Sequence, residues 1–84
     1  MRELLRLVIL SVRGTRTVID EIESLNVRLT DGTLLGIRPG HDKLVAMTDG
    51  TELTIQRNGE MEFANVTRGM LTVERNIVKI YTLV

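Results

Sequence analysis

Turn signals recur along this chain at intervals of roughly 8 to 12 residues, and no other feature of the sequence constrains the fold as strongly. Asp31-Gly32, Asp49-Gly50, Asn58-Gly59 and Arg68-Gly69 each separate apolar runs of strand length. Asn58-Gly59 is the strongest of these signals and predicts a two-residue hairpin turn with both residues at positive φ. We therefore predict an all-β fold, a small antiparallel β-sandwich of about ten short strands.

The pattern of apolar residues between these turns supports strands. Leu25, Val27 and Leu29 alternate with polar residues, which indicates a strand with one face in solvent. Residues 4–10 carry apolar side chains on both faces and predict a strand buried on both sides. Residues 42–47 fit either a helical turn or a short strand. No segment has a sustained helical period, so we expect no long helix.

The chain length and composition predict a single soluble domain over residues 1–84. A chain of 84 residues is too short to bury two cores. Hydrophobic residues make up 43 % and charged residues 26 %, the balance of a globular protein rather than a disordered tail. Because Phe63 and Tyr81 are the only aromatic residues, the core must be aliphatic and platforms for stacking nucleic-acid bases are nearly absent.

The charge balance excludes several classes of partner. Eleven Lys and Arg residues balance eleven Asp and Glu residues, so no net field attracts phosphate backbones or anionic lipid. The absence of cysteine fits a reducing compartment. Arg6 interrupts the first apolar run, which has neither the form of a signal peptide nor the length of a membrane span. We expect a cytosolic chain that recognises its partners locally.

The residues needed for catalysis or metal binding are missing. His41 is the only histidine and there is no cysteine, so neither a zinc site nor an activated nucleophile can be assembled. The glycines lie between strands rather than before a helix, which excludes a phosphate-binding loop. The carboxylate pairs Asp20-Glu21 and Glu60/Glu62 are interpreted as solvated strand and turn faces. We expect no catalytic residue, no metal and no cofactor.

Three segments resemble the N-terminal β-sandwich of the epsilon subunit of F-type ATP synthases. Residues 5–14 are similar to the family's opening strand and turn. Residues 35–44, Leu-Gly-Ile-Arg-Pro-Gly-His-Asp-Lys-Leu, are close to its Leu-Gly-Ile-x-Pro-Gly-His-x-x-Leu motif, the most specific match. Residues 63–73 are similar to its strand, glycine turn and strand, and residues 76–80 to the last edge. The chain ends before the family's C-terminal helical hairpin, so the inhibitory function and nucleotide site of that hairpin are not implied.

The resemblance implies a non-catalytic subunit of the rotor's central stalk. Its partners would be the gamma subunit and the c-ring, it would lie at the cytoplasmic face of the membrane without inserting, and it would be a monomer when isolated. Leu34, Leu44 and Met47 are expected in the core rather than at an interface, while Leu44 and Met47 are also the candidates for a gamma-subunit contact. The implied c-ring contact is one loop of mixed charge, formed by Arg38, Pro39, Gly40, His41, Asp42 and Lys43.

A second resemblance offers a different function. Residues 27–36 also look like the first motif of Sm-like RNA-binding barrels, and Arg68-Gly69 is similar to the second. That family would make the chain a ring-forming RNA binder. Ala46 stands where its base pocket requires Asn after Asp42, and the zero net charge disfavours RNA. A paralogous sandwich that serves as an unrelated interaction module is a third alternative.

Overall fold

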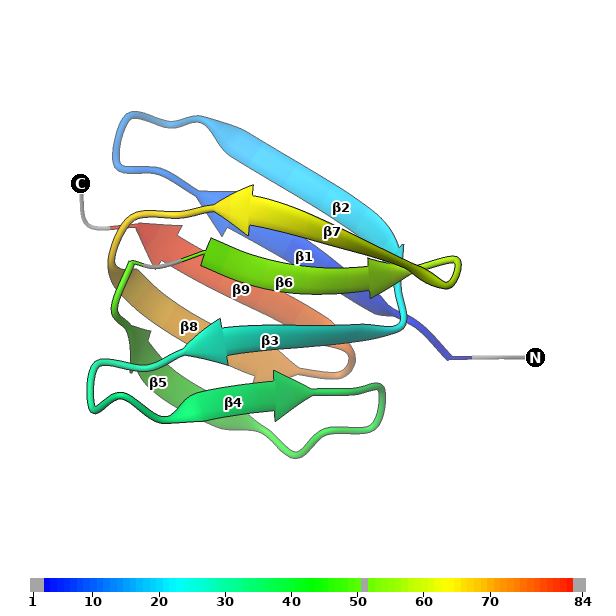
Figure 1. Cartoon of the computed structure of the whole chain (residues 1–84). Coiled ribbons are helices and arrows are strands. Elements are labelled where there is room, and N and C mark those ends of the chain that lie inside the picture. The colour runs from blue at the N-terminus through cyan, green and yellow to red at the C-terminus, as the bar shows by residue number, and fades with distance from the viewer. Residues whose placement is uncertain (1–2, 51, 83–84) are drawn as a thin grey trace.

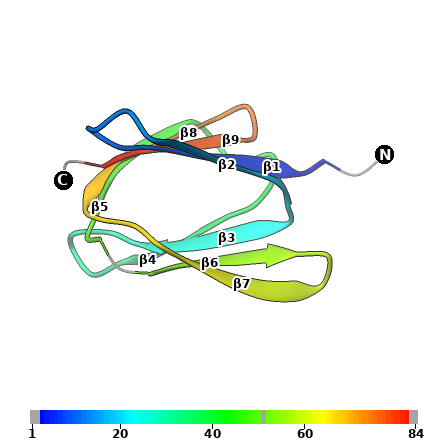
Figure 2. The same ribbon diagram turned by 90° about the horizontal axis from the view of Figure 1, so that it is seen from above.

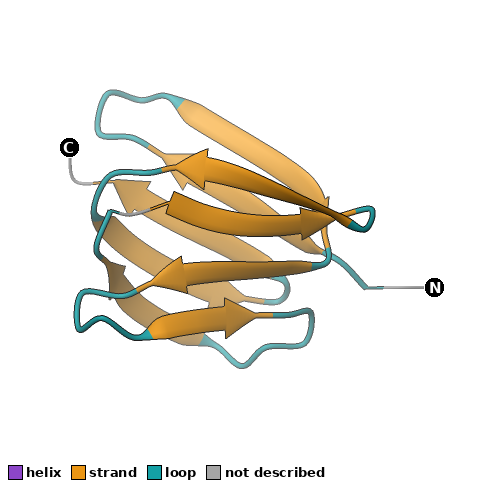
Figure 3. Cartoon of the chain, in the orientation of Figure 1, coloured by secondary structure: helices purple, strands orange, loops and turns teal. Residues whose placement is uncertain are grey.

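The computed structural model describes residues 3–50 and 52–82, where every regular element is a β-strand (Figures 1 and 3). The strands of these residues are β1 (Leu5–Leu10), β2 (Arg16–Ile22), β3 (Ser24–Arg28), β4 (Leu34–Ile37), β5 (Leu44–Thr48), β6 (Glu52–Arg57), β7 (Glu60–Asn65), β8 (Gly69–Glu74) and β9 (Ile77–Thr82). The segment left open between helical turn and strand is therefore a strand, β5.

The strands form two sheets that face each other as separate layers, as Figure 2 shows. Sheet A has the strand order β2-β1-β9-β8-β5, and sheet B has the order β4-β3-β6-β7. The predicted β-sandwich is confirmed. One pair departs from the antiparallel expectation, because β1 and β9 run parallel in the middle of sheet A. These strands come from opposite ends of the chain, so no hairpin fixes their relative direction.

The space between the sheets is filled by aliphatic side chains from alternate positions of the strands. Leu71 and Val73 of β8 point inward, as do Val78 and Ile80 of β9, while the residues between them point away. The only phenylalanine, Phe63, is 61 % exposed, which confirms the aliphatic core. The buried cluster comprises Leu5, Leu7, Ile22, Leu25, Val27, Ile37, Leu53, Ile55, Val66, Leu71, Val73, Val78 and Ile80.

Strand β1 is less buried than its sequence predicts. Leu5 and Leu7 face the core and Val8 is buried on the outer face, but Arg6 is exposed and the last residues of the strand are half-buried. Nothing in the described chain covers the outer face of sheet A. Val8 is shielded there by its neighbours in the sheet, because it pairs with Val18 of β2 and Lys79 of β9.

Strand β2 contains a β-bulge between Ile19 and Ile22, which the sequence did not predict. Leu5 pairs with Ile22 and Leu7 with Ile19, so β2 carries one extra residue in this interval. Glu21 takes up the irregularity with φ of 59°. As a result Ile19 and Ile22 both face the core, although their spacing does not match a regular strand.

The tight turns confirm the hairpin predictions. Arg57 pairs with Glu60, and the intervening Asn58 and Gly59 have φ of 51° and 75°. This is the primed two-residue turn that Asn-Gly predicts. Arg75 and Asn76 form a second turn of this kind between β8 and β9, with φ of 51° and 64°.

The expectation that Leu34, Leu44 and Met47 belong to the core is wrong for two of them. Leu34 is 66 % exposed and Met47 is 40 % exposed, whereas Leu44 is half-buried against the core. Pairing register decides this outcome, because a shift of one residue moves a side chain to the other face of a sheet. In β4, Ile37 is the buried residue, which places Leu34 on the outer face of sheet B.

Candidate partner-binding loop

The loop between β4 and β5 spans residues 38–43 and contains all six residues predicted to contact a c-ring. The Arg38 carbonyl accepts a hydrogen bond from the His41 amide at 3.1 Å, which closes a tight turn. Pro39 and Gly40 occupy its two central positions, and Gly40 has φ of 84°. This is the arrangement of a type II turn, in which proline fixes the first φ and glycine provides the positive second φ. Pro39 and Gly40 thus form the tip of the loop.

Two further hydrogen bonds hold this loop. The Gly40 amide donates to Oδ1 of Asn76 at 2.7 Å, which ties the loop to the β8–β9 turn. His41 Nδ1 lies 2.8 Å from the Asp42 carbonyl oxygen, so this hydrogen bond requires the proton on Nδ1. The backbone carbonyl of Asn76 accepts a hydrogen bond from the Arg6 amide at 2.9 Å. The loop, the β8–β9 turn and the start of β1 therefore meet at one end of the sandwich (Figure 1).

The loop presents polar groups to solvent. Arg38, Gly40, Asp42 and Lys43 are exposed, while Pro39 and His41 are half-buried. Within residues 3–50 and 52–82, the ion pairs found are Arg6 with Asp20 and Arg57 with Glu62, so none involves this loop. The charged groups of the loop are therefore available to a partner.

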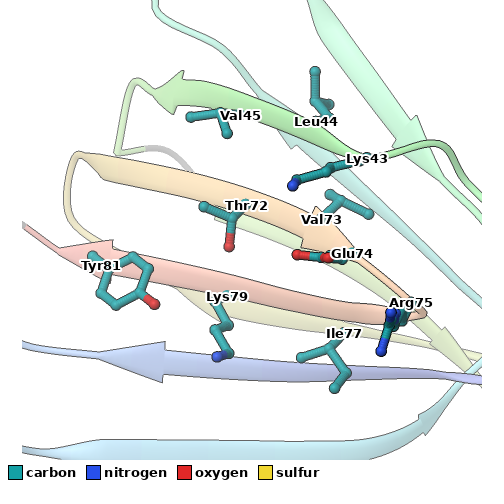
Figure 4. A pocket seen from close by; sticks show the side chains of 10 residues that line it. All are labelled: Lys43, Leu44, Val45, Thr72, Val73, Glu74, Arg75, Ile77, Lys79 and Tyr81. Atoms are coloured by element: carbon teal, nitrogen blue, oxygen red, sulfur yellow. The ribbon is translucent and has the colours of Figure 1, made fainter.

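Shallow grooves flank the loop on both sheets. One, of about 410 Å³, lies over the outer face of sheet B, where Gly36 leaves space beside Asn26 and Gln56, and reaches the loop at Arg38 and His41. The other, of about 380 Å³, lies over sheet A (Figure 4). It is lined by Lys43 and Leu44 from one edge and by side chains of β8 and β9 such as Glu74 and Lys79.

The two candidates for a gamma contact occupy different environments. Leu44 packs against the core and lines the groove on sheet A. Met47 lies on the outer face of the same sheet and pairs across strands with Met70, which is 37 % exposed. Val45, 62 % exposed, stands two residues before Met47 on the same face. Exposed apolar side chains grouped in this way suit a protein interface.

The sequence did not indicate that Arg75 and Asn76 accompany the loop. They lie more than thirty residues further along the chain, and their only local signal is that of a turn. The carboxylate pairs are solvated, as predicted, because Asp20, Glu21, Glu60 and Glu62 are all exposed. The described residues contain no group of three or more potential metal ligands. They also contain no helix that is long and apolar enough to span a membrane.

Among solved structures, the chain is similar to subunits of ATP synthases. It matches a chain of the Euglena gracilis mitochondrial ATP synthase, in a structure of OSCP, F1 and c-ring, with a TM-score of 0.78 and 17 % identity. That match covers 96 % of this chain and 51 % of the other. A chain of the Tetrahymena thermophila mitochondrial ATP synthase, from a structure of the central stalk and c-ring, matches with a TM-score of 0.68 and 13 % identity, covering 95 % and 63 %. At sequence identities this low, the structural similarity establishes a shared fold.

The chain thus spans about half to two thirds of the length of these structural relatives. Comparison with curated protein sequences gives no match. The two sheets define a small β-sandwich domain whose fold is shared with chains of these ATP synthases. Residues 4–83 match the model of the ATP synthase delta/epsilon chain β-sandwich domain. The chain belongs to this family, which selects the first of the two resemblances found in the sequence over the Sm-like barrel.

Proposed function

We propose that this domain is a non-catalytic subunit of the central stalk of a rotary ATP synthase, where it binds the gamma subunit and the c-ring and helps to couple ion translocation to ATP synthesis. Membership of the delta/epsilon family supports this proposal. The structural relatives come from assemblies described as containing a c-ring, and one as a central stalk. The domain would lie at the cytoplasmic face of the membrane, peripheral to it, and would be monomeric when isolated and free of nucleic acid.

The c-ring contact of this proposal is the β4–β5 loop. The observation that carries it is an ordered turn at one end of the sandwich that displays both signs of charge without internal ion pairs in the described chain. Pro39 and Gly40 would hold the shape, while Arg38, His41, Asp42 and Lys43 would offer polar groups. Opposite charges placed at a fixed position give orientation and specificity to a protein contact.

The experiment compares two variants of the subunit in a reconstituted ATP synthase. The first changes Arg38, His41 and Asp42 to alanine. The control changes Arg13 and Thr15 to alanine in the exposed β1–β2 turn, at the opposite end of the sandwich (Figure 1). We expect the loop variant to lose ATP-driven ion pumping while both variants keep their unfolding midpoints, because exposed loop side chains contribute within about 0.5 kcal/mol each. Full coupling with the loop variant incorporated would place the ring contact elsewhere.

The gamma contact would lie at β5, where Met47 is exposed on the outer face of sheet A and Leu44, packed against the core, lines the groove on that sheet. Met47→Asp places a charge among exposed apolar side chains that would be buried in a complex, so we expect co-purification with a gamma subunit to be lost. Met61→Asp is the matched control, because Met61 is 55 % exposed on sheet B. Equal retention of gamma by both variants would contradict this assignment.

A further inference from the structure

The β8–β9 turn carries a residue that its backbone does not favour. In a primed two-residue turn the second central position prefers glycine, because both residues require positive φ. Gly59 fills that position in the β6–β7 hairpin with φ of 75°. Asn76 fills it in the β8–β9 hairpin with φ of 64°, although glycine would adopt this conformation more easily. The backbone of the turn therefore gives no reason for asparagine over glycine here.

The side chain of Asn76 provides such a reason. Its Oδ1 accepts the Gly40 amide at 2.7 Å, across 36 positions of sequence. Gly40 sits at the tip of the β4–β5 loop, and a Cβ built on it would have no atom within 4 Å beyond its chain neighbours, so no other segment packs against that position. Within the described residues, the hydrogen bond to Asn76 ties Gly40 to a segment outside its own loop.

We propose that Asn76 is the positioning residue of the β4–β5 loop, and that the contact surface consists of this loop and the β8–β9 turn together. The identity of the partner in this inference rests on the proposed function, whereas the geometry of the surface does not. Arg75 then joins Arg38 and Lys43 as a third exposed cation on these two segments. The exposed anions among them are Asp42 and Glu74, and none of these five groups forms an ion pair within the described residues. Such a surface suits a polar protein loop with carboxylates that reach the three cations.

The first test measures the geometry in the isolated 84-residue chain. Asn76→Gly removes the acceptor and keeps the positive φ, so we expect the Gly40 amide to exchange its hydrogen about five-fold faster, the effect of losing one ordinary hydrogen bond. Asn76→Asp keeps an acceptor oxygen at the same place and should retain the wild-type exchange rate. Asn58→Gly is the matched control, since Asn58 also has positive φ in a hairpin turn and its side chain has no hydrogen bond in the described structure. It should leave Gly40 unchanged.

The second test measures assembly with the same variants. In a reconstituted ATP synthase, Asn76→Gly should reduce coupled ion pumping, and Asn58→Gly should behave as wild type. Asn76→Asp adds a negative charge to the proposed contact surface, so it serves only in the exchange measurement. The unfolding midpoint should fall little in Asn76→Gly, because the ease with which glycine adopts positive φ at this turn position offsets the lost hydrogen bond. That combination separates loop positioning from a general loss of stability.

Two outcomes would overturn the inference alone, and a third would overturn it together with the ring contact of the proposed function. Unchanged Gly40 exchange in Asn76→Gly would show that the asparagine does not hold the loop. Faster exchange with full coupling, alongside an uncoupled Arg38/His41/Asp42 alanine variant, would show that the loop acts without this restraint. Full coupling of the alanine variant itself would refute the ring contact, and with it the composite contact surface, while leaving the measured geometry intact.

Discussion

The hydroxyl of Thr48 bonds both backbone groups of Gly69, accepting from its amide and donating to its carbonyl, each at 3.1 Å. Thr48 is the last residue of β5 and is buried, and Gly69 is the first residue of β8 opposite it. The side chain thus continues the hydrogen-bonding ladder at the point where the strand ends. The hydroxyl is thus a partner for both polar groups of Gly69, and buried backbone groups require partners.

Replacing Thr48 by valine should destabilise the domain by about 1–3 kcal/mol, the cost of leaving a buried polar group without a partner. Valine has nearly the same shape, so packing changes little. Denaturant unfolding measures the effect. Thr54→Val, at a half-buried position on the outer face of sheet B, is the control and should change stability by about 0.5 kcal/mol or less. A Thr48→Val midpoint equal to that of the wild type would mean that another group satisfies Gly69.

Gly59→Val should cost at least about 1 kcal/mol, because a β-branched residue resists the left-handed conformation that this turn requires. A Cβ at this position would meet no atom within 4 Å, so the cost comes from the backbone and not from crowding. Gly59→Asn should retain most of the stability, since asparagine tolerates positive φ. Thermal unfolding compares the two variants, and equal losses would point to a cause other than φ.

Phe63→Ala should destabilise the domain by less than about 1 kcal/mol, far below the 3–5 kcal/mol typical of a buried phenylalanine. Its side chain is 61 % exposed on the outer face of sheet B. Leu71→Ala is the contrasting variant, because Leu71 is fully buried and should cost about 2–5 kcal/mol. Similar losses in the two variants, measured by denaturant unfolding, would contradict the placement of Phe63.

Asp31 should give the domain a pH-dependent contribution to stability. The backbone amide of Thr33 donates to Asp31 Oδ1 at 2.8 Å, and this bond, with help from the Thr33 hydroxyl, lowers the pKa of Asp31 below its ordinary value of 3.8. A depressed pKa in the folded state means that the stabilisation is present above 3.8 and is lost as the pH falls through the folded pKa. The stability advantage of the wild type over Asp31→Asn should therefore shrink in acid.

Two measurements check this prediction. Denaturant unfolding of both proteins over a pH series from about 6 to about 2 gives the stability difference. NMR titration of the Asp31 carboxyl group gives the folded pKa directly. A titration midpoint at or above 3.8 would contradict the direction of the shift.

The sequence by itself determined the elements of this protein. Turn chemistry is local, so Asn58-Gly59 and Pro39-Gly40 specified their turns through the φ values they allow. Strand periodicity is also local, and the alternation around Leu25 and Val27 correctly gave the buried face of β3. The motif of residues 35–44 identified the family, which the match over residues 4–83 bears out.

Only the tertiary structure decided which distant segments lie together. The parallel pairing of β1 with β9 joins the two ends of the chain, whose relative direction no hairpin fixes. The exposure of Leu34 depends on the register between strands, because Leu34 and Leu35 are both apolar and the local pattern does not choose which of them is buried. The bond from Gly40 to Asn76 joins segments 36 positions apart, and the local sequence of neither turn indicates it. The candidate surface at this end of the sandwich therefore emerged only once the chain was folded.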